Sequence, residues 1–205
     1  MSKSTSLYIH GLGRTELRPL ERLLLDKNQR KGLNYAAAYI DWCSPVTFSE
    51  LVERVVWQAS EMLSTLDDED VLILEGSSAG GSMAINALKK LDDPRVRAVS
   101  HSGRLSVGNY SDQSWRNLAR CAHLGTHRAS QSFFDSVTNC ESVTVPSLTD
   151  ADKSRIVITL PIADEVVPVQ TMTIEGVRAV RMPIVGHSLG IGMGILKLIP
   201  LAEEL

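Results

Sequence analysis

The sequence has few cysteines and no long apolar run, and each absence excludes a class of protein. Three cysteines occur among 205 residues, at positions 43, 121 and 140. Their odd number and their spacing match neither a disulfide framework nor paired CxxC zinc ligands, so we expect reduced thiols. Charge or glycine interrupts every apolar stretch before the roughly 20 residues that a membrane-spanning helix needs. We therefore expect no membrane insertion.

The chain also lacks an excess of charge of one sign. Lys and Arg total 21 against 24 Asp and Glu, which argues against nucleic-acid binding driven by bulk charge. The short polar N-terminus has neither the basic nor the apolar region of a signal peptide, so a cytoplasmic protein is expected. Because no repeat, low-complexity tract or linker is present, residues 1–205 are expected to form a single domain. The oligomeric state is left open.

Six short apolar or β-branched runs predict buried strands, and helical patterns lie between most of them. The runs are 7–9, 36–40, 71–74, 96–99, 156–160 and 177–180. The clearest helix is expected at 48–66, where apolar residues recur with helical spacing behind a capping box formed by Thr47 and Glu50. The alternation predicts an α/β fold with a mainly parallel sheet of about six strands flanked by helices.

One connection, residues 103–150, is longer and rich in Ser and Thr. It contains one expected helix around 112–124. Ligands of such sheets bind beyond the carboxyl ends of the strands, so this segment could be a small lid over an active site. A plain helical crossover is the alternative, because parallel strands need one. Phe133 would contribute either to an acyl pocket or to a satellite core.

The third apolar run is followed by Gly76-Ser77-Ser78-Ala79-Gly80 and then by a helical pattern. A G-x-S-x-G motif between a strand and a helix is typical of a nucleophile elbow, where the central serine occupies a strained turn that only small neighbours allow. The helix N-terminus adds partial positive charge and free amides beneath a developing oxyanion. Ser78 is therefore the candidate nucleophile. A Gly/Ser-rich turn that caps a helix is the structural alternative.

A serine nucleophile needs a base, and the base needs an orienting carboxylate. Asp164 follows the fifth run and His187 follows the sixth. The chain order serine, aspartate, histidine is that of the hydrolases that use a nucleophile elbow. Glu165 is the alternative acid, and an ordinary loop histidine is the alternative for His187.

Two further patterns compete with this assignment. Gly186-His187-Ser188-Leu189-Gly190 also matches G-x-S-x-G, but no aspartate and histidine follow Ser188, which we expect to cap the last helix. His123 and His127 would share one helix face with Cys121 nearby, yet no clear third ligand accompanies them, so no metal site is predicted.

Together these motifs resemble the α/β-hydrolase superfamily over nearly the whole chain. They are the His10-Gly11 pair after the first run, the Ser78 elbow, the Asp-x-Val-Val-Pro turn at Asp164 and the Gly186-His187 pair. The small size and the Gly-Ser-Ser-x-Gly-Gly elbow are similar to those of compact bacterial serine esterases with little or no cap. Relative to the full pattern of that family, the first two strands are expected to be missing.

The resemblance implies a carboxylesterase-like serine hydrolase that cleaves esters or thioesters of small to medium acyl groups through an acyl-enzyme, without a cofactor. It implies the catalytic set Ser78, Asp164 and His187, and an oxyanion hole formed by the backbone N–H groups of Leu12 and Ala79. A non-catalytic binding protein on the same fold, and an acyltransferase or peptidase with the same triad, are the alternatives.

Four more residues are expected at the substrate-binding site. They are His10, Gly11, Ser77 and His101. His10 is expected to hold the oxyanion loop by hydrogen bonds rather than to transfer protons. His101 ends the fourth apolar run at the same sheet edge as Ser78, and a polar residue that merely terminates a strand is the alternative.

Overall fold

The computed structural model describes residues 4–12, 16–107 and 130–198. Within these residues, six strands form one sheet in the order β2-β1-β3-β4-β5-β6, and all neighbouring strands are parallel. The strands are β1 (Ser4–Ile9), β2 (Asn34–Ala37), β3 (Val71–Ser77), β4 (Val96–His101), β5 (Ile156–Leu160) and β6 (Arg178–Arg181). Each overlaps a predicted apolar run, so the predicted parallel α/β architecture is confirmed.

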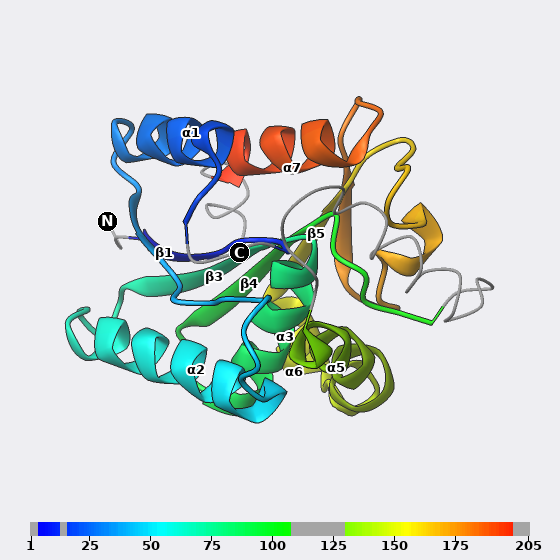
Figure 1. Cartoon of the computed structure of the whole chain (residues 1–205). Helices are drawn as coiled ribbons and strands as arrows, with labels where there is room; N and C mark the ends of the chain where they lie inside the picture. Colours follow the sequence, from blue (N-terminus) through cyan, green and yellow to red (C-terminus); the bar gives the residue numbers. More distant parts are fainter. Residues whose placement is uncertain (1–3, 13–15, 108–129, 199–205) are drawn as a thin grey trace.

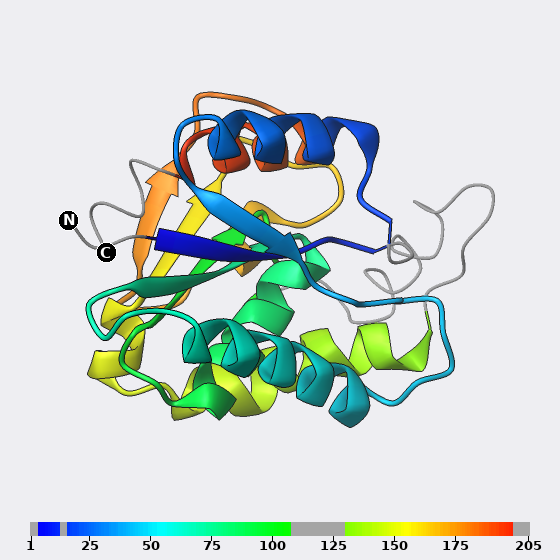
Figure 2. The ribbon, with the colours of Figure 1, turned by 90° about the vertical axis from the view of Figure 1, so that its left-hand side faces the viewer.

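Helices cover both faces of the sheet, as Figure 1 shows. One face carries α1 (Pro19–Gln29) and α7 (His187–Leu196). The other face carries α2 (Phe48–Ser64), α3 (Ala79–Leu91), α5 (Gln131–Asn139) and α6 (Asp150–Ser154). The same two helical layers appear in the view turned by 90° (Figure 2). A π-helical turn (Cys140–Thr144) and two 3₁₀ turns (Val145–Ser147 and Val169–Thr171) complete the helical elements of the described residues.

The predicted capping box starts α2. The Thr47 hydroxyl accepts a hydrogen bond from the Glu50 backbone N–H, and the Glu50 carboxylate accepts one from the Thr47 N–H. These bonds satisfy two amides that the first helical turn leaves without partners. The apolar face then buries Leu51, Val52, Val55, Ala59 and Leu63 against the sheet.

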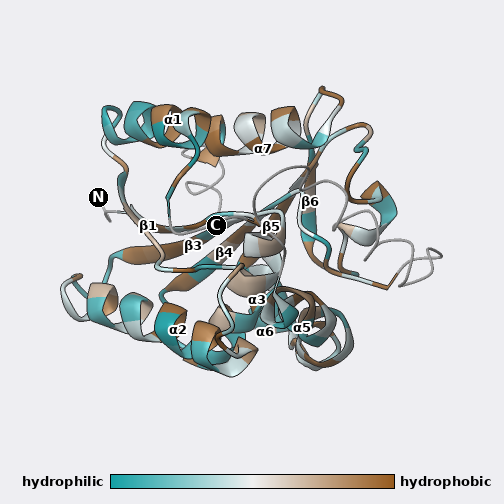
Figure 3. Ribbon diagram, in the orientation of Figure 1, coloured by the Kyte–Doolittle hydropathy of each residue, from teal (hydrophilic) through white to brown (hydrophobic). Residues whose placement is uncertain are grey.

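Alternation along the strands gives the two faces of the sheet different chemistry. The face under α2, α3 and α5 is apolar, with Leu7, Ile9, Leu72 and Leu74 fully buried in the main core. In Figure 3 brown predominates along β3, whereas β4 and β6 also carry teal residues. The face under α1 and α7 also carries polar side chains on the middle strands, which are described with the site below.

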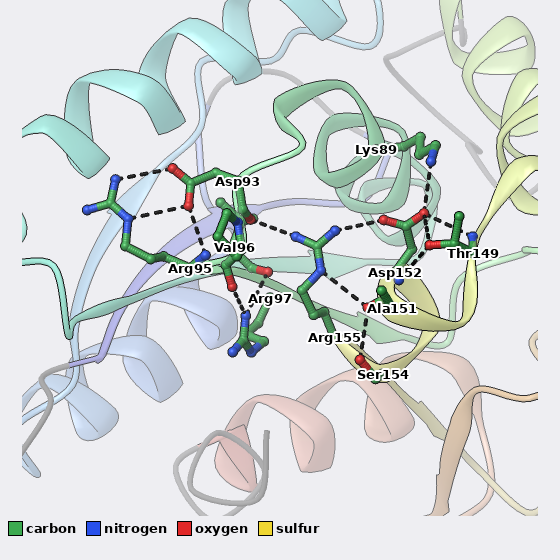
Figure 4. Close-up of polar contacts among 11 residues, drawn as sticks. Lys89, Asp93, Arg95, Val96, Arg97, Thr149, Ala151, Asp152, Ser154 and Arg155 are labelled. Atoms are coloured by element: carbon green, nitrogen blue, oxygen red, sulfur yellow. Dashed lines mark hydrogen bonds and ion pairs between the residues drawn. The ribbon is translucent and has the colours of Figure 1, made fainter.

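The edge of the sheet where β4 and β5 begin is held by charged groups (Figure 4). Asp152 accepts hydrogen bonds from Lys89 at 2.8 Å and from Arg155 at 2.7 Å, and Arg155 also donates to the Asp93 carbonyl at 2.6 Å. Burial alone would raise the pKa of Asp152, but the bonds from Lys89, Thr149 and Arg155 outweigh it and hold that pKa well below its ordinary value. This cluster joins α3, α6 and the start of β4.

Residues 103–150 are described in part. Their described portion includes α5, which packs against α3 and α2 on the apolar face of the sheet. The expected helix at 112–124 lies outside the described residues, so the choice between a lid and a plain crossover stays a prediction. Over the described ranges, no helix combines the length and apolar character required to cross a membrane.

Candidate active site

Ser78 lies at the turn between β3 and α3, which end and begin at its two neighbours. Its backbone has φ 53° and ψ −120°, a conformation that costs a non-glycine residue on the order of 1–3 kcal/mol. The surrounding structure maintains it, in part through a hydrogen bond of 2.8 Å from the Ser78 N–H to the His101 carbonyl. The G-x-S-x-G motif therefore forms the sharp strand-to-helix turn that its pattern predicts.

The two glycines of the motif are required by close backbone contacts. A Cβ atom at Gly76 would lie 2.1 Å from the Gly80 carbonyl oxygen, and one at Gly80 would lie 2.0 Å from the Ile9 carbonyl oxygen. Neither oxygen can move without displacing the main chain. The missing side chains let the start of α3 pack directly against the carboxyl ends of β1 and β3, and this packing places Ser78 at that edge of the sheet.

His187 is the first residue of α7, and its ring is held by Asp164 from the turn after β5. His187 Nδ1 lies 2.7 Å from Asp164 Oδ2. The other carboxylate oxygen, Oδ1, accepts hydrogen bonds of 2.8 Å from the N–H groups of Val166 and Val167. The Asp164 side chain is fully buried. The structure thus brings together the predicted acid and base, which are distant in sequence.

Glu165, the alternative acid, binds the same histidine at a different place. Its carboxylate accepts a hydrogen bond from the His187 backbone N–H, at 3.0 and 3.2 Å for the two oxygens. The ring is therefore held by Asp164 and the start of α7 by Glu165. The expectation that Ser188 caps this helix is wrong, because the helix begins one residue earlier, with Gly186 at the capping position.

Ser78 and His187 line one cavity of about 170 Å³ at the carboxyl ends of the strands. Gly11, Leu12 and Ala79 line the same cavity, so the two residues predicted to supply the oxyanion donors, Leu12 and Ala79, share it with Ser78. Five further apolar residues line the cavity, namely Phe133, Val137, Val166, Val167 and Ile191. The arrangement combines a strained serine, an imidazole held by a carboxylate, and a pocket for an apolar group.

His10 directly precedes Gly11 and Leu12, where the sequence predicts an oxyanion donor, and it is buried. Its Nδ1 lies 2.6 Å from the Gly11 carbonyl oxygen, and its Nε2 lies 2.9 Å from the Ile40 carbonyl oxygen. The His10 carbonyl in turn accepts a hydrogen bond from the Trp42 indole. The side chain is placed to hold the loop, and it is not part of the described cavity wall.

Ser77 and His101 lie within the sheet rather than at the cavity, which corrects the expectation of substrate contact. His101 is fully buried, with Nε2 3.0 Å from Glu75 Oε1 and Nδ1 2.9 Å from Thr159 Oγ1. Helix α7 covers it closely, since a Cβ atom at Gly194 would lie 2.3 Å from His101 Nδ1. Both side chains point to the α1 and α7 face because strand alternation turns them away from the elbow.

Ser77 belongs to the same buried polar row. Its hydroxyl lies 2.7 Å from the Tyr8 hydroxyl, and Ser6 donates to Glu75 at 3.0 Å. Burial raises the pKa of the Tyr8 phenol well above its ordinary value, and the negative charges of Glu21 and Glu75 raise it further. The phenol therefore stays protonated, and the row supports the strand that carries Ser78.

Three charged residues that the sequence patterns did not single out also line the cavity: Arg18, Glu21 and Arg104. Arg104 is buried and forms an ion pair with Glu141. Its place just beyond the carboxyl end of β4 is the one signal in the sequence that could have indicated it, because ligands bind at that edge of such sheets. The zinc alternative at His123 and His127 lies outside the described residues.

No protein-family model and no curated protein sequence matches this chain. Solved structures do match it over nearly the full length. A structure of one of the metagenome-derived lipolytic enzymes LipS and LipT has a TM-score of 0.69 at 16% identity, and the match covers 100% of this chain and 95% of that one. The chain has the α/β-hydrolase fold.

Two further structures also match nearly the whole chain. A carboxylesterase of the thaumarchaeon Nitrososphaera gargenis gives a TM-score of 0.68 at 12% identity, with 99% of this chain and 91% of that chain covered. The monoacylglycerol lipase of Paleococcus ferrophilus gives 0.62 at 13% identity, with 100% and 97% covered. At these identities the structural similarity establishes the α/β-hydrolase fold, and the catalytic chemistry of this chain depends on its own site residues.

Proposed function

We propose that this α/β-hydrolase-fold protein is a serine hydrolase that cleaves carboxylic esters or thioesters of small to medium acyl groups. The observation that carries the proposal is the pairing of His187 with the buried carboxylate of Asp164, in the cavity that also contains the strained Ser78. A serine, a histidine base and a carboxylate that orients the histidine are the residues that nucleophilic acyl transfer requires.

In the proposed reaction, Ser78 Oγ attacks the carbonyl carbon while His187 Nε2 removes the hydroxyl proton. Asp164 keeps the other ring nitrogen, Nδ1, protonated and stabilises the imidazolium. The N–H groups of Leu12 and Ala79 donate to the oxyanion, and losing one such donor typically costs about 10²–10³ in rate. The imidazolium then protonates the departing alcohol or thiol, and a water molecule releases the acyl group by the same steps.

The shape and lining of the cavity support the substrate class. Its volume of about 170 Å³ suits a short acyl group better than a long chain. Phe133 and Val137 of α5 offer apolar contacts to that group, and the Phe133 ring is held edge-on against Trp42 at 5.9 Å between centroids. A rigid aromatic wall limits the size of the acyl group by steric contact.

Covalent labelling with a fluorophosphonate, read by intact-mass spectrometry and peptide mapping, tests the proposal. We expect one adduct, on Ser78, and none in the Ser78→Ala variant. Ser188 is a matched control because it is a second serine that lines the same cavity, so Ser188→Ala should label like the unchanged protein. An adduct on Ser188, or no adduct on folded protein, would contradict the assignment.

A further inference from the structure

A second, smaller cavity lies between α1 and α7, and we refer to it as the α1/α7 groove. Its volume is about 100 Å³, and its walls include Leu20 and Leu24 of α1 and Ile191, Gly192 and Ile195 of α7. Figure 3 shows α7 coloured white to brown over most of its length. From Ser188 to Ile195 the groove follows α7 for about 10 Å, at 1.5 Å per helical residue. Apart from Arg18, Glu21 and Ser188, its lining is apolar or glycine.

The α1/α7 groove adjoins the active-site cavity. Arg18, Glu21, Ser188 and Ile191 line both spaces. The Glu21 carboxylate at this border is bonded by the Arg18 backbone N–H at 3.0 Å. Near the other end, the Asn28 side chain donates to the Ile195 carbonyl at 2.6 Å and ties the two helices together. A molecule bound at Ser78 could thus extend between two helices that are fixed to each other.

The chemistry of acyl transfer determines which part of an ester faces this groove. The imidazolium of His187 must give its proton to the leaving oxygen, so the alcohol portion lies on the histidine side of the cavity. His187 is the first residue of α7; Ser188 follows it in the first turn, and Ile191 lies one turn further along the helix. Phe133 and Val137 belong to α5, in the opposite helical layer, and they remain available to the acyl group.

We propose that the α1/α7 groove is the alcohol-side subsite and that it takes an unbranched aliphatic alcohol group. This inference rests on the proposed hydrolase function and adds a second specificity to it: the acyl group is limited by α5, whereas the alcohol chain extends along α7. A Cβ atom at Gly192 would lie in van der Waals contact with Leu24, 3.4 Å from its Cδ1, and so would face α1 across the groove. A longer side chain at position 192 would occupy the groove.

A comparison of two isomeric esters distinguishes binding of the alcohol group from binding of the acyl group. Hexyl acetate carries its chain on the alcohol, and ethyl hexanoate carries it on the acyl group, with the same atoms in both. In Gly192→Leu we expect the ratio of kcat/KM for hexyl acetate to that for ethyl hexanoate to fall about tenfold, as loss of an apolar pocket for methylene groups implies. Leucine is also a better helix former than glycine, so the variant should fold.

Two more variants complete the test. Leu24→Ala widens the groove and should raise kcat/KM for octyl acetate relative to hexyl acetate severalfold. Leu189→Phe adds bulk to an exposed position of α7 outside the groove and should leave the isomer ratio unchanged. A ratio that stays constant or rises in Gly192→Leu would overturn the groove assignment alone. Absence of Ser78-dependent hydrolysis of both isomers by the unchanged protein would contradict the proposed function, and the subsite with it.

Discussion

The Glu165 carboxylate holds the backbone of His187, with its two oxygens 3.0 and 3.2 Å from the histidine nitrogen. Asp164, the preceding residue, holds the imidazole ring of the same histidine at 2.7 Å. Two adjacent carboxylates on one turn after β5 thus fix both the start of α7 and the orientation of its first side chain. The negative charge of Glu165 also lies at the positive end of the α7 dipole, where it is favourable.

Replacing Glu165 with Ala should lower kcat about tenfold with a smaller effect on KM, because a small displacement of a catalytic group is costly. Glu165→Gln keeps an oxygen that can accept the His187 N–H bond and should restore most of the activity. Steady-state kinetics on a short-chain ester, with thermal unfolding of each variant, measures both effects. Equal losses in the Ala and Gln variants would show that the hydrogen bond to the backbone is not what matters.

Asp164→Asn should abolish most activity while preserving the fold. The asparagine oxygen can still accept the N–H bonds of Val166 and Val167, but its amide N–H would face His187 Nδ1. The ring proton would then move to Nε2, so the imidazole could no longer act as the base. We expect kcat to fall by on the order of 10³–10⁴. A kcat close to that of the unchanged protein would show that the pairing of Asp164 with His187 has no catalytic role.

Gly76→Ala and Gly80→Ala should each prevent stable folding, because their Cβ atoms would lie 2.1 and 2.0 Å from main-chain oxygens. Displacing backbone in a packed core costs several kcal/mol, a large share of the about 5–15 kcal/mol that stabilises a typical domain. Gly32→Ala is a control for loss of glycine at a site with open space around it. Its φ of 99° makes it strained, yet it should still yield soluble protein with a lowered melting temperature.

Asp152→Asn should reduce the free energy of unfolding at pH 7 by about 1.5–3 kcal/mol, since the charged donors Lys89 and Arg155 lose their charged acceptor. The folded-state pKa of Asp152 is lowered, so its contribution is fully present above the unfolded pKa, near 4, and is lost progressively as the pH falls from there to the lower folded-state pKa. Urea unfolding at pH 7 and pH 3 should therefore show a smaller difference between variant and unchanged protein at the lower pH.

A matched control for that experiment is the exposed ion pair between Lys90 and Glu53. Glu53→Gln should change the free energy of unfolding by less than about 1 kcal/mol, because solvent screens surface pairs. A difference between Asp152→Asn and the unchanged protein that does not shrink at pH 3 would show that the carboxylate charge is not responsible. Figure 4 shows the hydrogen-bond donors around Asp152, namely Lys89, Thr149 and Arg155, whose contribution the experiment measures.

The sequence by itself determined the elements and their order. Strand and helix periods, the Thr47 capping box and the Gly76-to-Gly80 motif depend on neighbours within a few residues along the chain, so local patterns are sufficient to predict them. The order of Ser78, Asp164 and His187 was also readable, because the topology of a parallel sheet brings the carboxyl ends of its strands to one edge.

Only the tertiary structure decided which side chains meet. The sequence left Glu165 as an alternative to Asp164, and the packing of α7 beyond β5 places Asp164 against the His187 ring and Glu165 against the His187 backbone. His101 lies at the predicted sheet edge, yet its side chain points to the face covered by α7, because a one-residue change of position along a strand reverses its direction. The α1/α7 groove is formed by segments more than 150 residues apart in the chain. Local sequence patterns cannot predict a contact between segments so far apart.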